Sequence, residues 1–308
     1  LLNPGFAFAS SILLVAGLCV LAVVQNSRTL AVLGILAGFM APLWLSTGSG
    51  NHVGLFSYYA VLNAGIFAIA WFRPWRALNL LGFAFTFGIG TFWGVLQYAP
   101  DKFSSTEPFL LLFFAFYLLI PLLYARRQPA GRRDLVDGSL VFGTPLVAFS
   151  MQAGMLHEQP MTLALCALGL AAIYAVLARA LIARASYTVL AQSHAVLAVG
   201  FATLAVPLAL SARATGAVFA LEGAGLAWLG LRQKRWLPQV SGALLQIGAA
   251  FAFVAGADHW LDDARVLLNP TAIGALLLAI AGFASAWSYQ RRERHEIALV
   301  YYLWGLLW

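Results

Sequence analysis

Long apolar stretches alternate with short polar breaks along the whole chain. A helix that crosses a bilayer needs about 20 mainly apolar residues, and the pattern supplies that length repeatedly. We therefore predict an all-α fold, a polytopic transmembrane helical bundle with about twelve spans. The expected spans cover residues 5–24, 29–46, 53–72, 77–97, 108–124, 137–157, 160–179, 187–210, 214–231, 236–257, 271–289 and 296–308.

The composition excludes most water-soluble classes of protein. Of the 308 residues, 62% are hydrophobic and 9% are charged, whereas a soluble domain has about 25% charged residues. So few charges cannot form a polar surface around twelve buried helices, which excludes a soluble enzyme, a secreted disulfide scaffold and a disordered chain. Cys19 and Cys166 lie inside apolar runs, so we expect buried small side chains and neither a disulfide nor a metal site.

The basic residues predict an orientation in the membrane. The net charge is +7, and of the 18 Lys and Arg residues only Lys102, Arg213 and Arg265 fall in even-numbered loops. Short cytoplasmic loops collect Lys and Arg. We therefore expect the odd-numbered loops to be cytoplasmic and the two chain ends to lie on the outer side. Because the charges are spread over many loops, we expect contacts with membrane lipids and no nucleic-acid partner.

A short motif occurs twice. Leu1–Pro4 has the same four residues as Leu267–Pro270, and each copy precedes an apolar run of the same predicted orientation. We predict a ten-span membrane unit over residues 1–266 and the first spans of a possible second repeat over 267–308. The alternative is that Asn-Pro is simply a favourable start for a helix. Since the chain begins and ends at apolar runs, we expect it to be a piece of a longer protein.

Four polar residues fall inside predicted spans. Glu222 is the most informative, because an ionised carboxylate in hydrocarbon must be paired, hydrated or protonated. At about 1.5 Å per residue, Glu222 lies about 13 Å from the cytoplasmic end of its span, Gln246 about 15 Å and His194 about 10 Å. Consecutive spans are often neighbours, so these three residues could form a buried polar cluster. Asn63 falls at a similar depth on the third span.

This cluster has two interpretations. The functional one is a site that handles a proton, a cation or a substrate. The structural one is a protonated Glu222 bonded to Gln246, since hydrogen bonds between membrane helices commonly join them. The structural interpretation is favoured slightly, because no second acid lies within the spans and the same helix carries a close-packing stripe of small residues, Gly216, Ala220 and Ala224.

The outer loops hold a second group of candidates. They are His52, His157, Asp258 and His259. Folding could bring them together as metal ligands, but they come from three loops without diagnostic spacing, which favours a solvated surface and no metal. Residues 258–270 mix acidic and apolar side chains, which predicts an amphipathic segment on the outer interface or a docking segment for a partner.

Two local features concern helix ends and kinks. Ser105 or Thr106 is predicted to cap the fifth span, with Glu107 and Pro108 in its first turn. Pro145 is expected to kink and interrupt the sixth span, because proline removes a backbone donor. Broken helices often line transporter sites.

No nucleotide-binding, metalloprotease, thiol-redox or serine-hydrolase motif occurs in the chain, so we expect no cofactor.

Several segments together resemble the bacterial membrane-protein family catalogued as domain of unknown function 2339, and the resemblance extends through nearly the whole chain. They are Gly38–Pro42 with Ser46–Phe56 and Tyr58–Gly65, Trp75–Phe87 with Glu107–Leu110, Asp137–Gln152, Leu204–Leu210, and Ala220–Gln233.

The resemblance implies a very long inner-membrane protein with many spans, often preceded by a soluble region. It implies no activity and no catalytic residues. It suggests one partner, a periplasmic protein with a β-rich domain and a single membrane anchor. It also implies a small or apolar residue at position 194 in relatives, which favours Glu222 over His194 for a mechanism that the family shares.

Three functions remain open, and none of them is indicated by a motif. A transporter- or channel-like protein is favoured by the number of spans, the possible duplication, Pro145 and Glu222. A structural or assembly protein of the cell envelope would bind its periplasmic partner through the outer loops. A membrane-embedded enzyme acting on a lipid-linked glycan ranks last, because it needs clustered acids or histidines at an interface; we expect the protein not to be an enzyme.

Overall fold

The computed structural model describes residues 4–44, 51–73, 75–125, 135–183, 187–256 and 270–308. These residues form α-helices and one short 3-10 helix, and they include no strand, so the predicted all-α class is confirmed. The helices are α1 (Pro4–Val24), α2 (Arg28–Trp44), α3 (His52–Phe72), α4 (Arg76–Gln97), η1 (Pro100–Lys102), α5 (Phe103–Ala125), α6 (Leu135–Met155), α7 (Pro160–Leu181), α8 (Thr188–Ala209), α9 (Ala212–Gln233), α10 (Trp236–Ala255), α11 (Pro270–Gln290) and α12 (His295–Leu307).

The α-helices coincide with the predicted apolar runs. Within the described residues, eight of them are long and apolar enough to cross a membrane. Helix α2 has 17 residues and α12 has 13. The protein is therefore a membrane protein with several apolar helices, and the exact number of spans stays a prediction.

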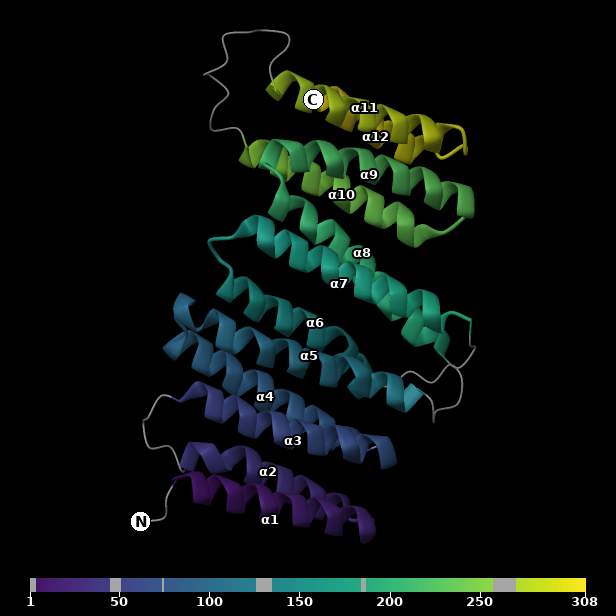
Figure 1. Cartoon of the computed structure of the whole chain (residues 1–308). Helices are drawn as coiled ribbons and strands as arrows, with labels where there is room; N and C mark the ends of the chain where they lie inside the picture. The colour runs from purple at the N-terminus through teal and green to yellow at the C-terminus, as the bar shows by residue number, and fades with distance from the viewer. Residues whose placement is uncertain (1–3, 45–50, 74, 126–134, 184–186, 257–269) are drawn as a thin grey trace. The chain divides into compact units, whose positions relative to one another are not determined.

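The chain divides into two compact units, Leu1–Ala202 and Thr203–Trp308, with the boundary inside α8. Unit 1 contains α1 to α7 and most of α8, and unit 2 contains the end of α8 and α9 to α12 (Figure 1). The predicted ten-span unit over residues 1–266 and the repeat that would begin at residue 267 stay predictions.

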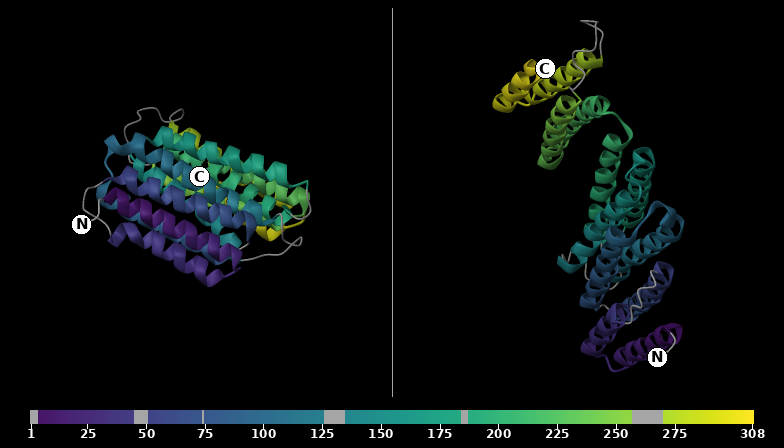
Figure 2. Two further views of the ribbon diagram at one scale, coloured as in Figure 1. Left: turned by 60° about the horizontal axis from the view of Figure 1, so that its bottom comes forward. Right: turned by 90° about the vertical axis from the view of Figure 1, so that its left-hand side faces the viewer.

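In unit 1, consecutive helices lie side by side with their axes roughly aligned (Figures 1 and 2). A group of four helices forms its centre: α3 packs on α4 and α5, while α6 packs on α4 and α5. Helices α1 and α2 pack against α3 and α4, and α7 packs against α6. The central group, α3 to α6, surrounds the candidate site described below.

In unit 2, α9 and α10 form a very close pair, and α11 packs on α9 and α12. A Cβ atom added at Gly223 would lie 2.6 Å from the carbonyl oxygen of Gly242, so the two backbones approach as closely as only glycine allows. Gly216 and Ala220 of the predicted small-residue stripe are buried and Ala224 is half-buried. The closest contacts, however, belong to Gly223 and Gly230, which the predicted stripe omitted.

Helix α5 starts earlier than predicted. It begins at Phe103, directly after the 3-10 turn η1, and not near residue 108. Thr106 therefore lies inside α5 and is not its N-cap, and the Ser105 hydroxyl donates to the Lys102 carbonyl at 3.0 Å. The prediction of a cap at Ser105 or Thr106 was wrong, because the 3-10 turn passes directly into α5.

Helix α6 continues through Pro145, so this proline does not divide the helix.

We expect Gly223→Ala to lower the free energy of unfolding by about 1–3 kcal/mol, because the new Cβ would overlap the backbone of α10. Thermal unfolding of the purified chain in detergent measures this effect. Gly225→Ala is the matched control on the same helix, because a Cβ there meets no atom within 4 Å. Equal stability of the two variants would show that the close approach of α9 and α10 does not hold unit 2 together.

Candidate binding site

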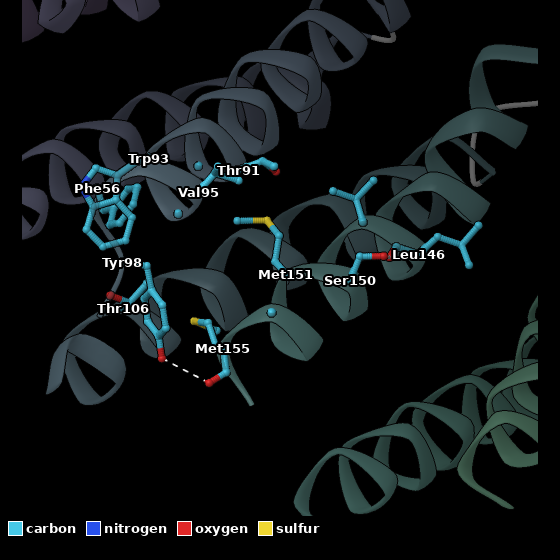
Figure 3. Close-up of a pocket in the computed structure, with 14 residues that line it drawn as sticks. Phe56, Thr91, Trp93, Val95, Tyr98, Thr106, Leu146, Ser150, Met151 and Met155 are labelled. Carbon is cyan, nitrogen blue, oxygen red and sulfur yellow. Dashed lines mark hydrogen bonds between the residues drawn. The ribbon is translucent and has the colours of Figure 1, made fainter. Parts of the chain in front are cut away.

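A pocket of about 550 Å³ lies between α4 and α6, with walls completed by α3, α5 and the segment after α4 (Figure 3). Its surface is mainly apolar and aromatic. This volume is in the range of small-molecule sites in proteins, about 300–1,000 Å³. The lining residues are Phe56, Gly90, Thr91, Trp93, Gly94, Val95, Tyr98, Thr106, Leu146, Val147, Ser150, Met151, Gly154 and Met155.

A smaller cavity of about 30 Å³ adjoins the pocket and shares five of its lining residues, including Phe56 and Thr106. It extends the site toward Thr86 on α4. The Thr106 side chain is buried, and its hydroxyl has no hydrogen-bond partner. Thr106 therefore offers a free donor and acceptor to a molecule that enters from the pocket.

One end of the pocket is polar. The Tyr98 hydroxyl donates to the Met155 carbonyl at 3.3 Å and so joins the end of α4 to the end of α6 (Figure 3). Beside it, the Gln152 amide donates to the Glu107 carboxylate at 2.8 Å. Burial, followed by the negative charges of Glu107 and Asp101, raises the pKa of Tyr98 above its ordinary value. Tyr98 is therefore a neutral hydrogen-bond donor at physiological pH.

Trp93 lines the pocket and also contacts two polar residues that do not line it. The His52 ring stacks on Trp93 with ring centroids 5.0 Å apart, and the Lys102 ammonium lies 5.8 Å from the Trp93 centroid. The His52 Nε2 atom is 2.8 Å from the Ser105 hydroxyl. These contacts hold the Trp93 ring, which lines the pocket.

A buried polar group joins three helices of unit 1. The Asn63 amide on α3 donates to the Thr86 hydroxyl on α4 at 2.8 Å and to the Tyr59 carbonyl at 2.8 Å. Its amide oxygen accepts from the Tyr117 hydroxyl on α5. Asn63 and Tyr117 are almost completely buried. Asn63 thus acts as the centre of a satisfied hydrogen-bond network, and Thr86 connects this network to the small cavity.

His194 lies elsewhere in unit 1. Its Nδ1 atom is 2.7 Å from the Leu190 carbonyl oxygen, and its ring packs against Tyr174 on α7 with centroids 5.3 Å apart. A carbonyl can only accept, so Nδ1 carries the proton and the Nε2 lone pair of the neutral ring is left as an acceptor. His194 is 1% exposed, and its Nε2 atom has no partner.

The two other predicted residues belong to unit 2 and do not bond to each other. Glu222 is exposed on α9. The Gln246 amide instead donates to the Ser285 hydroxyl on α11 at 2.7 Å, and its amide oxygen is unpaired. The expected Glu222–Gln246 hydrogen bond is therefore not formed, because Gly223, and not Glu222, is the residue of α9 that faces Gln246.

Two of the outer-loop candidates, His52 and His157, are described, and each has a different partner. His52 stacks on Trp93, as described above, while His157 and Glu158 form an exposed pair with a 3.5 Å contact. Asp258 and His259 lie outside the described residues. Among the described residues, no group of three His, Cys, Asp or Glu side chains could hold a metal ion.

The sequence singled out Asn63 and His52, neither of which lines the pocket, and it assigned none of the lining residues to a binding site. Thr106 was considered only as a helix cap, and nothing in the spacing of Thr86, Tyr117 and Gln152 along the chain indicates that they lie near one site. Trp93 near a helix end looks like an ordinary interfacial anchor. Only the packing of α3 to α6 brings these residues together.

Comparison with known proteins assigns the chain to a family but not to an activity. The model of a family described as predicted membrane protein (DUF2339) matches residues 1–308, which confirms the resemblance found in the sequence. No curated protein and no solved structure matches the chain.

We expect Asn63→Leu to lower the free energy of unfolding by about 1–3 kcal/mol, because it leaves the buried hydroxyls of Thr86 and Tyr117 without their partner. The melting temperature of the purified chain measures the loss.

The matched control is Asn79→Leu on α4. Asn79 is equally buried, but both of its amide atoms lack a partner, so its replacement is expected to leave the stability unchanged or to raise it. If the two substitutions had the same effect, the Asn63 network would not stabilise unit 1.

Proposed function

Starting from the family to which this chain belongs, the DUF2339 predicted membrane proteins, we propose a transporter-like protein that binds an amphipathic, mainly apolar molecule. The observation that carries the proposal is the pocket of about 550 Å³ between α4 and α6. The pocket is mainly apolar, with Tyr98 and Thr106 at one end and the smaller polar side chains of Thr91 and Ser150 further along (Figure 3). This lining complements a molecule with a hydrocarbon body and a polar head.

The polar end suits a head group that accepts and donates hydrogen bonds. Glu107 and Gln152 already bond each other, while Thr106 offers an unpaired hydroxyl. Lys102 lies behind Trp93 at the same end and adds a positive charge nearby. On the predicted topology this end faces the outer side of the membrane, so the molecule would enter from the outer half of the bilayer.

The lining favours an amphiphile over a small inorganic ion. None of the fourteen residues that line the pocket is charged, whereas pathways for ions use ionisable side chains or rings of backbone carbonyls. This narrows the transporter- or channel-like prediction toward a transporter of a lipid-like molecule. A role for Glu222 in handling protons or cations stays a prediction.

Binding is favoured over catalysis for the same site. The His52–Ser105 contact at 2.8 Å has the residue types of a base and a nucleophile. Ser105, however, lines neither the pocket nor the small cavity, and its hydroxyl also contacts the Lys102 carbonyl. A molecule in the pocket would therefore meet Trp93 and Thr106 and not this pair.

The assembly function stays an alternative. A periplasmic single-anchor partner was expected to bind the outer loops, and the segment named for it, residues 258–268, lies outside the described residues. Loss of such a partner on deletion of this segment would support the alternative.

We expect Gly94→Leu to reduce labelling of the chain by a photoreactive, diazirine-bearing phosphatidylethanolamine several-fold. Gly94 lines the pocket, and the space beside it is open, so the larger side chain fills the pocket without displacing its neighbours. Mass spectrometry of labelled peptides from α4 and α6, after reconstitution in bilayers, measures the occupancy.

Gly88→Leu is the control on the same helix, since Gly88 also has open space beside it but does not line the pocket. Labelling of Gly94→Leu at the wild-type level would refute binding in the pocket. Transport is then tested with a fluorescent lipid in proteoliposomes: binding without faster exchange between leaflets would identify a lipid-binding protein and not a transporter.

A further inference from the structure

A third, very small cavity lies among α5, α6, α7 and α8 in unit 1 and shares no lining residue with the pocket. Its volume is about 10 Å³, which is close to the minimum that a single water molecule requires. Although the cavity is small, its walls carry an unusual number of polar groups for the interior of a membrane protein.

Three of these groups are buried side-chain atoms without a partner. They are the Thr144 hydroxyl, the Tyr174 hydroxyl and the His194 Nε2 atom. Thr144, Tyr174 and His194 are each 1% exposed. They come from α6, α7 and α8, and all three residues line the same cavity. An unpaired polar atom in such a place costs about 1–3 kcal/mol.

Two prolines beside the cavity each leave a backbone carbonyl without its helical donor. Pro121 in α5 has no N–H, so the carbonyl of Tyr117, four residues earlier, loses its usual helical donor. Pro145 in α6 deprives the carbonyl of Val141 in the same way. Both Tyr117 and Val141 line the cavity. In membrane helices, ordered water is one of the means by which carbonyls freed by proline are satisfied.

The donors and acceptors are complementary to water. Because Nδ1 of His194 carries the ring proton, Nε2 must accept. The two hydroxyls can donate or accept, and the two carbonyls can only accept. A water molecule donates two hydrogen bonds and accepts two, so it can bond His194, one carbonyl and both hydroxyls at once.

We propose that this cavity binds one ordered water molecule, which donates to His194 Nε2 and joins α6, α7 and α8 at the proline positions of α5 and α6. The water replaces direct polar contacts between these helices, which meet mainly through aromatic rings, such as Tyr174 against Phe201. The site is independent of the pocket between α4 and α6, so it stands whether or not an amphipathic molecule binds there.

The first test is ¹⁵N NMR of the whole chain in bilayer nanodiscs, labelled at histidine. We expect His194 Nε2 to show the chemical shift of a hydrogen-bonded acceptor, together with magnetisation transfer from a bound water. The signal is assigned by its loss in His194→Gln. A shift typical of an unbonded ring nitrogen would overturn the proposal, and so would a bonded nitrogen without transfer from water, because Tyr174 would then bond it directly.

The second test uses the sign of a stability change. With water present, Thr144→Val and Tyr174→Phe each remove a hydrogen bond to it and are expected to lower the melting temperature by roughly 2–4 °C. In a dry cavity the same substitutions remove an unpaired buried hydroxyl, so the melting temperature would stay the same or rise. That outcome would overturn the proposal.

Thr215→Val is the matched control in unit 2. Thr215 is also buried with an unpaired hydroxyl, but it lines none of the three cavities. Its replacement is expected to leave the melting temperature unchanged or to raise it. Gly94→Leu fills the pocket between α4 and α6 and is expected to leave the His194 NMR signal unchanged. The test of the proposed function and the test of this water site therefore give independent results.

Discussion

The need to pair polar groups away from water governs this structure more than any other constraint. Inside a membrane, a polar group without a partner costs several kcal/mol, and bulk water is absent to compensate. Unit 1 meets the constraint at Asn63, which bonds groups on α3, α4 and α5. In unit 2, the Gln246 amide nitrogen donates to Ser285 on α11, although the Gln246 amide oxygen is unpaired. These bonds join helices that apolar packing alone would leave free to slide.

The same constraint explains where the candidate site lies. Close to the Asn63 network, α3, α4 and α5 are held together, and Thr86 links the network to the small cavity beside the pocket. Toward the ends of α4 and α6 the glycines and methionines line a mainly apolar space, and the Tyr98 hydroxyl and the Glu107–Gln152 pair lie near one end of it. The result is a hydrocarbon-like interior with a polar end, the arrangement on which the proposed function rests.

Glu222 and Pro145 show why single residues were poor guides. An ionised carboxylate in hydrocarbon has a high free-energy cost, so Glu222 was expected to have a buried partner. It is instead exposed on α9. Pro145 was expected to interrupt its helix, but α6 continues through it, and the proline deprives the carbonyl of Val141, a residue that lines the same cavity as His194, of its helical donor. In both cases the residue type was informative, whereas its role depended on which face of the helix it occupies.

The sequence by itself determined the membrane class, the positions of the helices along the chain and membership of the family, because apolar length and loop composition are local properties. It also indicated that Asn63 and His194 are unusual, since each is a polar side chain within an apolar run. Only the tertiary structure decided that Tyr117 and Thr86 complete the Asn63 network, that Thr144, Tyr174 and His194 share one cavity, and that Thr106 faces a pocket. The physical reason is that most surfaces of a membrane helix are similarly apolar, so the pattern along one helix does not specify which neighbour it will contact.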